Sequence, residues 1–143
     1  MTSRLGVGPV AIDSAAFIYY IEGHAQYRTT LAPLFAAIDA GRIRAFTSAI
    51  TLLEVLVAPY REKNFELATE FELILTRSRG LQLVALSPAL LRLAASLRAQ
   101  FGLRTPDALQ AAAGAAEGCT ALVTNDRRWP AAIGPMRIVQ LAG

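Results

Sequence analysis

Short, solidly apolar runs recur along the chain and predict the strands of a central sheet. They span Val10–Ile12, Ile43–Thr47, Leu81–Leu86, Ala121–Thr124 and Ile138–Leu141. These runs are apolar at nearly every position and do not alternate with polar residues. That pattern is typical of parallel strands covered by helices on both faces.

Helical patterns fill the intervals between these runs. We expect helices over Ala15–Glu22, Tyr27–Ala40, a segment that begins at Ser48 as its N-cap, Arg61–Arg79, a segment opening at Ser87-Pro88, and a segment from Thr105-Pro106 to Gly118. Alternation of strands and helices predicts an α/β fold. The expected architecture is a three-layer α/β/α sandwich with a short, mostly parallel sheet of four to five strands. At 143 residues, the chain is predicted to be a single domain over 1–143.

Four acidic residues stand where such a fold places its ligands. Asp13 and Asp126 follow the first and fourth predicted strands, and Asp107 lies in the first turn of a helix. Glu54 lies one to two turns into its own helix. In open α/β sheets, ligands bind beyond the carboxyl ends of the strands. We therefore expect the four carboxylates to converge on one pocket.

Glu54 is the most informative of the four. It lies in the apolar stretch Ile50–Val57, and no residue three or four positions away carries a positive charge. Removing a carboxylate from water costs several kcal/mol unless a partner compensates it. The other three each have a structural explanation: Asp107 gains from the helix dipole, Asp13 suits a helix cap, and Asp126 suits a turn.

Taken together, the four carboxylates predict a metal site. Clustered carboxylates repel one another, and a divalent cation resolves that repulsion. Mg²⁺ and Mn²⁺ prefer oxygen ligands and leave coordination positions open to phosphate oxygens. This favours phosphodiester hydrolysis. The hypothesis requires that the acids share a site and are not individually paired with arginines.

Composition narrows the remaining functions. Thirteen of the 14 basic residues are arginine, whose guanidinium group can donate two parallel hydrogen bonds to a phosphate. A high Arg-to-Lys ratio also results from genome base composition. Cys119 and His24 are the sole residues of their types, which excludes an internal disulfide and the usual zinc clusters. Asp13 interrupts the apolar stretch Leu5–Ile21, so we reject a signal peptide. No apolar run is long enough to span a membrane, and we expect a cytoplasmic protein.

Several other sites and enzyme classes are disfavoured. We expect His24 to be solvated in a loop, Cys119 to be a buried small hydrophobe, and Trp129 to pack rather than stack on a base. A receiver or haloacid-dehalogenase domain needs a late lysine, and the single lysine here is Lys63. No Gly-rich loop ending in Gly-Lys-Ser/Thr is present, which excludes a P-loop enzyme.

The ordered motifs resemble those of the PIN-domain ribonucleases, and among them the VapC toxins of bacterial toxin–antitoxin pairs. They are Asp13-Ser14 after the first strand, the segment Ser48–Val55 with Glu54, Thr105-Pro106-Asp107-Ala108, and Val123-Thr124-Asn125-Asp126-Arg127. The resemblance spans Val10 to Leu141. Each motif alone is common, whereas the set of four in this order is specific.

The resemblance implies an endoribonuclease dependent on Mg²⁺ or Mn²⁺, with RNA as substrate. Asp13, Glu54, Asp107 and Asp126 match the family's acidic quartet as catalytic and metal-binding residues. Thr124 and Ser14 match secondary polar positions. The resemblance also implies a homodimer and inhibition by a small VapB-like antitoxin, which would dock an amphipathic helix and place a cation in the acidic pocket.

The departures from the family pattern are mild. Many relatives follow the first acid with Thr-Ser or Thr-Asn, where this chain has Ser14-Ala15. Arg127-Arg128-Trp129 follows the last acid, and the two arginines fit either RNA backbone contacts or an exposed loop. One alternative stays open, namely a catalytically silent PIN fold that binds RNA or protein. The sequence also leaves open the choice between one metal and two, and the identity of the RNA.

Overall fold

Six strands form one sheet in the computed structural model of the protein, which describes residues 2–142. They are β1 (Val10–Ile12), β2 (Ala45–Ser48), β3 (Leu81–Val84), β4 (Ala121–Thr124), β5 (Ala132–Ile133) and β6 (Met136–Gln140). The strand order is β3-β2-β1-β4-β6-β5, and every pair is parallel except β5 and β6. The parallel sheet was predicted, and its carboxyl edge is the relevant one for a site.

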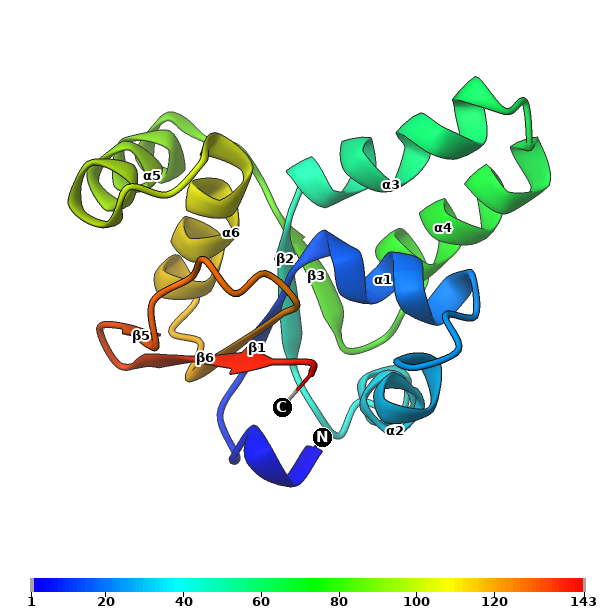
Figure 1. The fold of residues 1–143 in the computed structure, drawn as a ribbon, viewed down its shortest axis with the longest axis horizontal. Coiled ribbons are helices and arrows are strands. Elements are labelled where there is room, and N and C mark those ends of the chain that lie inside the picture. Colours follow the sequence, from blue (N-terminus) through cyan, green and yellow to red (C-terminus); the bar gives the residue numbers. More distant parts are fainter. Residues whose placement is uncertain (1, 143) are drawn as a thin grey trace.

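Helices cover both faces of this sheet (Figure 1). A short 3₁₀ turn, η1 (Thr2–Arg4), precedes α1 (Ser14–Ile21), α2 (Arg28–Asp39), α3 (Ile50–Arg61), α4 (Phe65–Arg77), α5 (Pro88–Phe101) and α6 (Thr105–Ala116). Helices α1 to α4 supply one hydrophobic cluster, and α5 and α6 supply the other. The predicted three-layer α/β/α sandwich is confirmed.

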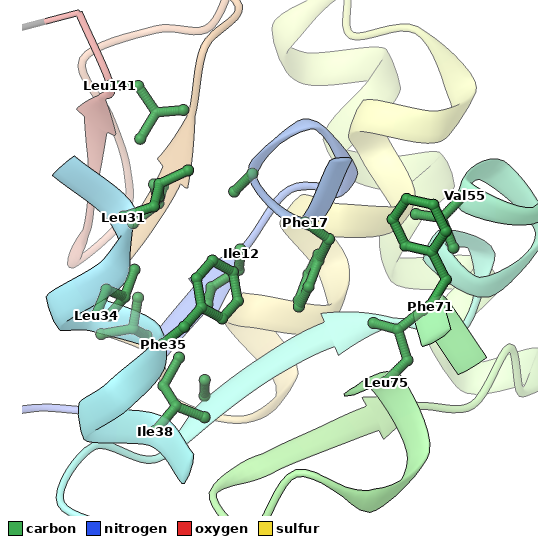
Figure 2. Close-up of a cluster of buried hydrophobic side chains, with 14 of the residues drawn as sticks. Ile12, Phe17, Leu31, Leu34, Phe35, Ile38, Val55, Phe71, Leu75 and Leu141 are labelled. Carbon is green, nitrogen blue, oxygen red and sulfur yellow. The ribbon is translucent and has the colours of Figure 1, made fainter. Parts of the chain in front are cut away.

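The strands divide their side chains between the two clusters. Val10 and Ile12 of β1 belong to the cluster under α1 to α4, whereas Ala11 between them belongs to the cluster under α5 and α6. Figure 2 shows Ile12 beside Phe17 of α1 and Phe35 of α2. Burying one such side chain contributes about 1.5–3 kcal/mol. Both faces are apolar, which explains why the strand sequences show no alternation.

The predicted helix over Arg61–Arg79 was wrong at its start. Helix α3 continues to Arg61, and α4 begins only at Phe65. Between them Lys63 takes a left-handed conformation with φ of 55°, and the Asn64 side chain accepts the Leu67 N–H at 3.1 Å. A turn and an N-cap therefore override the apolar periodicity.

Two smaller features also differ from the expectations. Ser48 is not the N-cap of α3; it ends β2, and its Oγ accepts the Ile50 N–H at 3.2 Å. The sheet gains a sixth strand because Gly134 turns the chain, with φ of 56°, and pairs β5 with β6. A two-residue strand such as β5 is too short to show any periodicity.

A buried polar network joins the carboxyl ends of β1 and β2 to α3 and α6. Gln110 of α6 is 1% exposed; its Oε1 accepts the Ser48 N–H at 3.0 Å, and its Nε2 donates to the Thr51 hydroxyl at 2.7 Å. The Thr51 and Thr47 hydroxyls lie 2.6 Å apart, and Thr47 donates to the Ile12 carbonyl at 2.7 Å. These bonds fix the elements that carry Asp13, Glu54 and Asp107, because each acid lies within three residues of the network.

Replacing Gln110 with leucine should therefore destabilise the protein. The substitution keeps the approximate side-chain volume, leaves the Ser48 N–H buried without a partner, and removes one of the two hydrogen bonds of the Thr51 hydroxyl. An unsatisfied buried group costs about 1–3 kcal/mol and a lost hydrogen bond about 0.5–1.5 kcal/mol, so we expect a loss of about 2–4 kcal/mol in the free energy of unfolding. Urea denaturation measures this loss. The same change at the exposed Gln82 of β3 should alter stability by less than about 0.5 kcal/mol; equal effects at the two positions would contradict the assigned role.

Candidate active site

One pocket of about 490 Å³ at the carboxyl edge of the sheet brings the four acids together. Asp13, Glu54, Asp107 and Asp126 all line it. They come from the end of β1, from α3, from the first turn of α6, and from the loop after β4. The expected convergence of these residues in the fold is thus observed.

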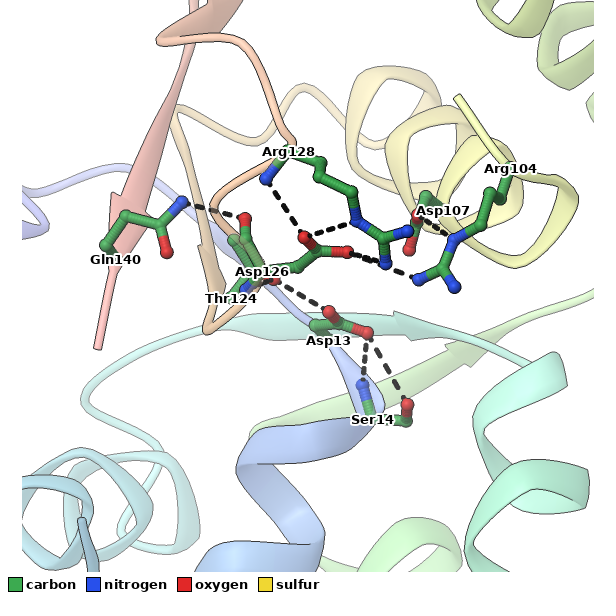
Figure 3. A network of polar contacts seen from close by, with 8 residues as sticks. All are labelled: Asp13, Ser14, Arg104, Asp107, Thr124, Asp126, Arg128 and Gln140. Atoms are coloured by element: carbon green, nitrogen blue, oxygen red, sulfur yellow. Dashed lines mark hydrogen bonds and ion pairs between the residues drawn. The ribbon is translucent and has the colours of Figure 1, made fainter. Parts of the chain in front are cut away.

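Asp13 is positioned by the start of α1, where it is the N-cap. Its Oδ1 accepts the Ser14 N–H at 2.7 Å, and its backbone is extended with ψ of 155°. Its Oδ2 accepts the Thr124 hydroxyl at 2.8 Å (Figure 3). Both carboxylate oxygens are thus oriented by neighbours, as the capping explanation and the secondary polar role of Thr124 each require.

Thr124 connects two of the acids. Its hydroxyl donates to Asp13 and accepts the Asp126 N–H at 3.1 Å. Gln140 of β6 adds a hydrogen bond from its Nε2 to the Asp126 carbonyl at 2.9 Å (Figure 3). The loop after β4 is therefore held beside Asp13 by side chains from β4 and β6.

Asp13 and Glu54 share an unfavourable environment for negative charge. Burial is the largest cause that raises the pKa of the Asp13 carboxyl, and the hydrogen bonds from Thr124 and Ser14 offset part of it. Burial likewise raises the pKa of the half-buried Glu54, which the Ser14 hydroxyl lowers in part. The charge of Asp107 raises both, and that of Asp13 raises Glu54. In the described chain, neither Asp13 nor Glu54 has an ion-pair partner.

Two arginines neutralise the other two acids. Arg104 reaches Asp107 Oδ2 from its Nε at 3.4 Å and Asp126 Oδ2 from its Nη2 at 3.2 Å. Arg128 donates two hydrogen bonds to the Asp126 carboxylate, from Nη2 at 2.7 Å and from Nε at 3.0 Å (Figure 3). These bonds, with Arg128 the largest cause, lower the pKa of the Asp126 carboxyl. Both guanidinium side chains are more than half exposed, so they can leave the acids at little cost.

The metal hypothesis is therefore met in part by this arrangement. Among the described residues, no three acid, histidine or cysteine side chains are gathered closely enough to hold a metal ion together. The physical reason is that Asp107 and Asp126 turn toward Arg104 and Arg128. Asp13 and Glu54 have no ion-pair partner in the described chain, and the charge of Arg104 lowers the pKa of Glu54 by less than burial raises it.

Sequence reasoning missed Arg104. It stands at the N-cap position of α6, three residues before Asp107, and that spacing is a recognised signal for a side-chain pair. Its second partner, Asp126, is 22 residues away, and no local pattern indicates that contact. The surroundings of Glu54 also differ from the expectation, because Leu53 and Val57 beside it are 59% and 43% exposed.

The residues set aside from the sequence lie outside the acidic pocket or in the core. His24 is exposed and packs against Tyr19 and Tyr27, with ring centroids 4.7 and 4.9 Å apart. Cys119 is buried, which raises the pKa of its thiol to about 12. Trp129 is 6% exposed in the core under α5 and α6, as predicted.

Replacing Glu54 with glutamine should stabilise the metal-free protein at neutral pH. Because burial raises the pKa of Glu54 above its ordinary 4.5, its ionised form is unfavourable in the folded chain. Below pH 4.5, Glu54 is protonated and does not reduce the stability of the wild type. As the pH rises through the pKa of Glu54 in the folded state, the side chain ionises and the wild type loses stability. The advantage of the variant should therefore shrink as the pH falls toward 4.5.

Urea denaturation in chelator across this pH range measures the difference. Glu70→Gln, at an exposed acid of α4, is the matched control and should follow the wild type at every pH. A wild type more stable than Glu54→Gln at neutral pH would show that Glu54 has a stabilising partner in the fold.

The comparisons with known proteins agree with this fold. The PIN domain family profile matches residues 10–134. A toxin–antitoxin complex from Klebsiella pneumoniae is 20% identical, with a TM-score of 0.69 over 92% of this chain and 97% of that chain. VapBC2 from Rickettsia felis, bound to a DNA fragment from its promoter, is 19% identical, with a TM-score of 0.65 over 92% and 97%.

A third solved structure is VapC20 of Mycobacterium tuberculosis, described as a sarcin–ricin loop cleaving toxin. It is 15% identical, with a TM-score of 0.64 over 79% of this chain and 86% of that chain. No curated protein matches the chain in sequence. These likenesses show the fold, and the family match covers most of the chain. By that match, the chain belongs to the PIN domain family.

Proposed function

We propose that the protein is an endoribonuclease dependent on Mg²⁺ or Mn²⁺ and the toxin of a VapBC-type toxin–antitoxin pair. The observation that carries the proposal is the pair of acids without a cation, Asp13 and Glu54, in a pocket that Asp107 and Asp126 also line. Four carboxylates at the carboxyl edge of a parallel sheet have no better explanation in the packing, because burial disfavours two of them.

The similar structures support the nature of the substrate and the partner. One of them is described as cleaving the sarcin–ricin loop, which is RNA, and others are toxin–antitoxin complexes. For this chain we take RNA as the substrate and a small antitoxin as the partner. A homodimer in the cytoplasm completes the proposal. Separately, in the part of the chain that the structure describes, no helix has the length and apolarity needed to cross a bilayer.

The donor set fits a hard divalent cation. All the candidate ligands are oxygens, and Asp13, Glu54 and Asp107 would hold the ion, with Asp126 in direct or water-mediated contact. When bound, Mg²⁺ or Mn²⁺ supplies charge for the phosphate oxygens and acidifies water for attack. Arg104 would give up Asp107 to admit the cation, and its exposed guanidinium could then pair with phosphate.

The residues of the chain have separate tasks in this proposal. Asp13 and Glu54 orient the attacking water, and the ordered bonds of Asp13 to Ser14 and Thr124 fix its oxygens. Arg104 and Arg128 line the same pocket, where they can receive the negative charge of the phosphodiester. In-line attack by water that breaks the P–O3′ bond, with a proton passing to the departing 3′-oxygen, leaves 5′-phosphate and 3′-hydroxyl ends.

An exposed apolar surface on α3 and α4 fits the proposed antitoxin. Its large members are Leu53, Val57, Tyr60, Phe65 and Leu73, each more than 40% exposed. The two helices lie side by side (Figure 1), and α3 also carries Glu54. Phe71 of α4 is buried in the core and is not part of this surface.

One observation favours the alternative, a catalytically silent PIN fold that binds RNA or protein. Asp107 and Asp126 are already neutralised by Arg104 and Arg128, as they would be in a protein that needs no cation. The nuclease remains the better proposal, because Asp13 and Glu54 have no ion-pair partner and their pKa values stay raised although Ser14, Thr124 and Arg104 offset part of the effect of burial.

Cleavage of a labelled single-stranded RNA distinguishes the two. The wild type should cut in Mg²⁺ or Mn²⁺ and stop in chelator. Asp13→Asn and Glu54→Gln should each lower the rate by at least about 100-fold, because each removes a charge that binds the cation and orients water. Gel electrophoresis with a phosphatase step identifies the 5′-phosphate ends.

Glu70→Gln is the control and should cut like the wild type. Equal cutting by wild type, Asp13→Asn and Glu54→Gln would mean a contaminating nuclease and would defeat the proposal. A thermal scan adds a readout independent of activity: saturating Mn²⁺, at about 100 times its Kd, should stabilise the wild type by about 2.7 kcal/mol and Glu54→Gln by much less.

A further inference from the structure

The amino ends of the parallel strands form a second charged edge, on the side away from the acidic pocket. Leu81, Ala45, Val10, Ala121 and Arg137 lie in register across β3, β2, β1, β4 and β6. In Figure 1, η1 and the link from α2 to β2 approach the strands at this end, whereas α1 and α3 leave from the other. Anything bound at this edge is therefore bound away from the four acids.

Four exposed arginines stand along this row. Arg79 precedes β3 by two residues, Arg42 and Arg44 precede β2, and Arg137 lies in the row itself on β6. From β3 to β6 there are four strand spacings of about 4.8 Å, so the row is about 19 Å long. We name Arg42, Arg44, Arg79 and Arg137 the arginine strip.

The four residues of the arginine strip lie in or beside one cavity. Arg42 and Arg44 line a cavity of about 600 Å³ whose walls include Gly6 and Gly41. Arg137 closes one end, since its Nη2 lies 3.5 Å from where a Cβ on Gly6 would be. Arg79 closes the other, with its Nε 3.1 Å from the corresponding position on Gly41.

The charge of the arginine strip is not neutralised within the described chain. Every ion pair among residues 2–142 lies in the acidic pocket, so no carboxylate is within 4.0 Å of these four guanidinium groups. Asp39 and Glu117, near the ends of α2 and α6, are the acids nearest this edge along the chain, and neither pairs with them. Arg44 instead lies over the Phe46 ring, 5.3 Å from its centroid, which leaves its hydrogen-bond donors available.

We propose that the arginine strip binds the phosphodiester backbone of a nucleic acid, at a site separate from the acidic pocket. Guanidinium groups fork onto phosphate oxygens, and four of them along about 19 Å exceed what a single phosphate can engage. A polyanion of several nucleotides fits the length and the charge. The strip contacts no bases in this proposal, so it adds affinity without sequence preference.

Fluorescence anisotropy with labelled poly(U) and poly(dT) of about 20 nucleotides tests the proposal. The intact chain is used in chelator, so that cleavage cannot occur. Arg42→Gln/Arg44→Gln should weaken binding roughly tenfold at about 0.15 M salt. It should also reduce the slope of log affinity against log salt by about 1.4, the value for two lost contacts on a single strand.

Arg61→Gln/Arg92→Gln is the matched control. It removes the same charge from exposed positions on α3 and α5, outside the strip, and should bind like the wild type. Equal losses for the two double variants would show that only net charge acts, and would overturn the proposal, as would absence of binding by the wild type. If the double variant loses affinity for poly(U) alone, the strip binds RNA. If it loses affinity equally for both probes, the strip binds the backbone of RNA or of DNA.

Two further outcomes distinguish the arginine strip from the proposed nuclease site and from a membrane-binding surface. A chain that binds poly(U) through the strip but cuts no RNA in Mg²⁺ would keep the strip and refute the proposed nuclease. Binding to vesicles that contain phosphatidylserine, without binding to either oligonucleotide, would assign the edge to a membrane surface and refute the strip as a nucleic-acid site. Unchanged urea midpoints in both double variants confirm that folding is intact.

Discussion

The geometry of the acidic pocket depends on one buried amide, that of Gln110. The four acids cannot hold their own elements together, because like charges repel and burial opposes the ionisation of two of them. The neutral network does so instead: Gln110 bonds to the end of β2 and to Thr51 of α3, and Thr47 continues to the carbonyl of Ile12. A polar network whose members are satisfied specifies one arrangement, since any slip leaves a buried group unpaired.

The pocket contains two kinds of carboxylate, and this division follows from which acids an arginine side chain reaches. Asp13 and Glu54 lie toward the interior, where burial raises their pKa values and no guanidinium is paired with them. Asp126 lies on a loop at the rim, within reach of long, exposed arginine side chains. The inner pair therefore favours a cation most strongly. Asp107 is also buried, with 9% of its surface exposed, but like Asp126 it is balanced by an arginine that can exchange partners, so the pocket can accept either a metal ion or a phosphate without rebuilding its walls.

The features that follow from a parallel sheet could be predicted from the sequence. The contacts that long side chains make between distant elements could not. The strands, the layers and the positions of the four acids follow from apolar runs and from the rule that their carboxyl ends meet at one edge. The start of α4 was missed because the Asn64 cap competes with an unbroken apolar periodicity. Gln110 went unnoticed in an alanine-rich helix, and the reach of Arg104 to Asp126 depends on tertiary contact alone.

The two edges of the sheet differ in charge and lie a short distance apart: the amino edge carries the arginine strip, whereas the carboxyl edge combines four acids with Arg104, Arg127 and Arg128. The strands between them are three to five residues long, which at about 3.3 Å per residue separates the edges by roughly 10–17 Å. A polyanion that approaches the molecule is therefore attracted by the arginine strip and repelled by the inner acids until a cation offsets their charge. The inner acids repel a phosphate backbone that is bound at the amino edge. We expect cation binding in the pocket to remove this repulsion, so that the backbone can also reach the carboxyl edge.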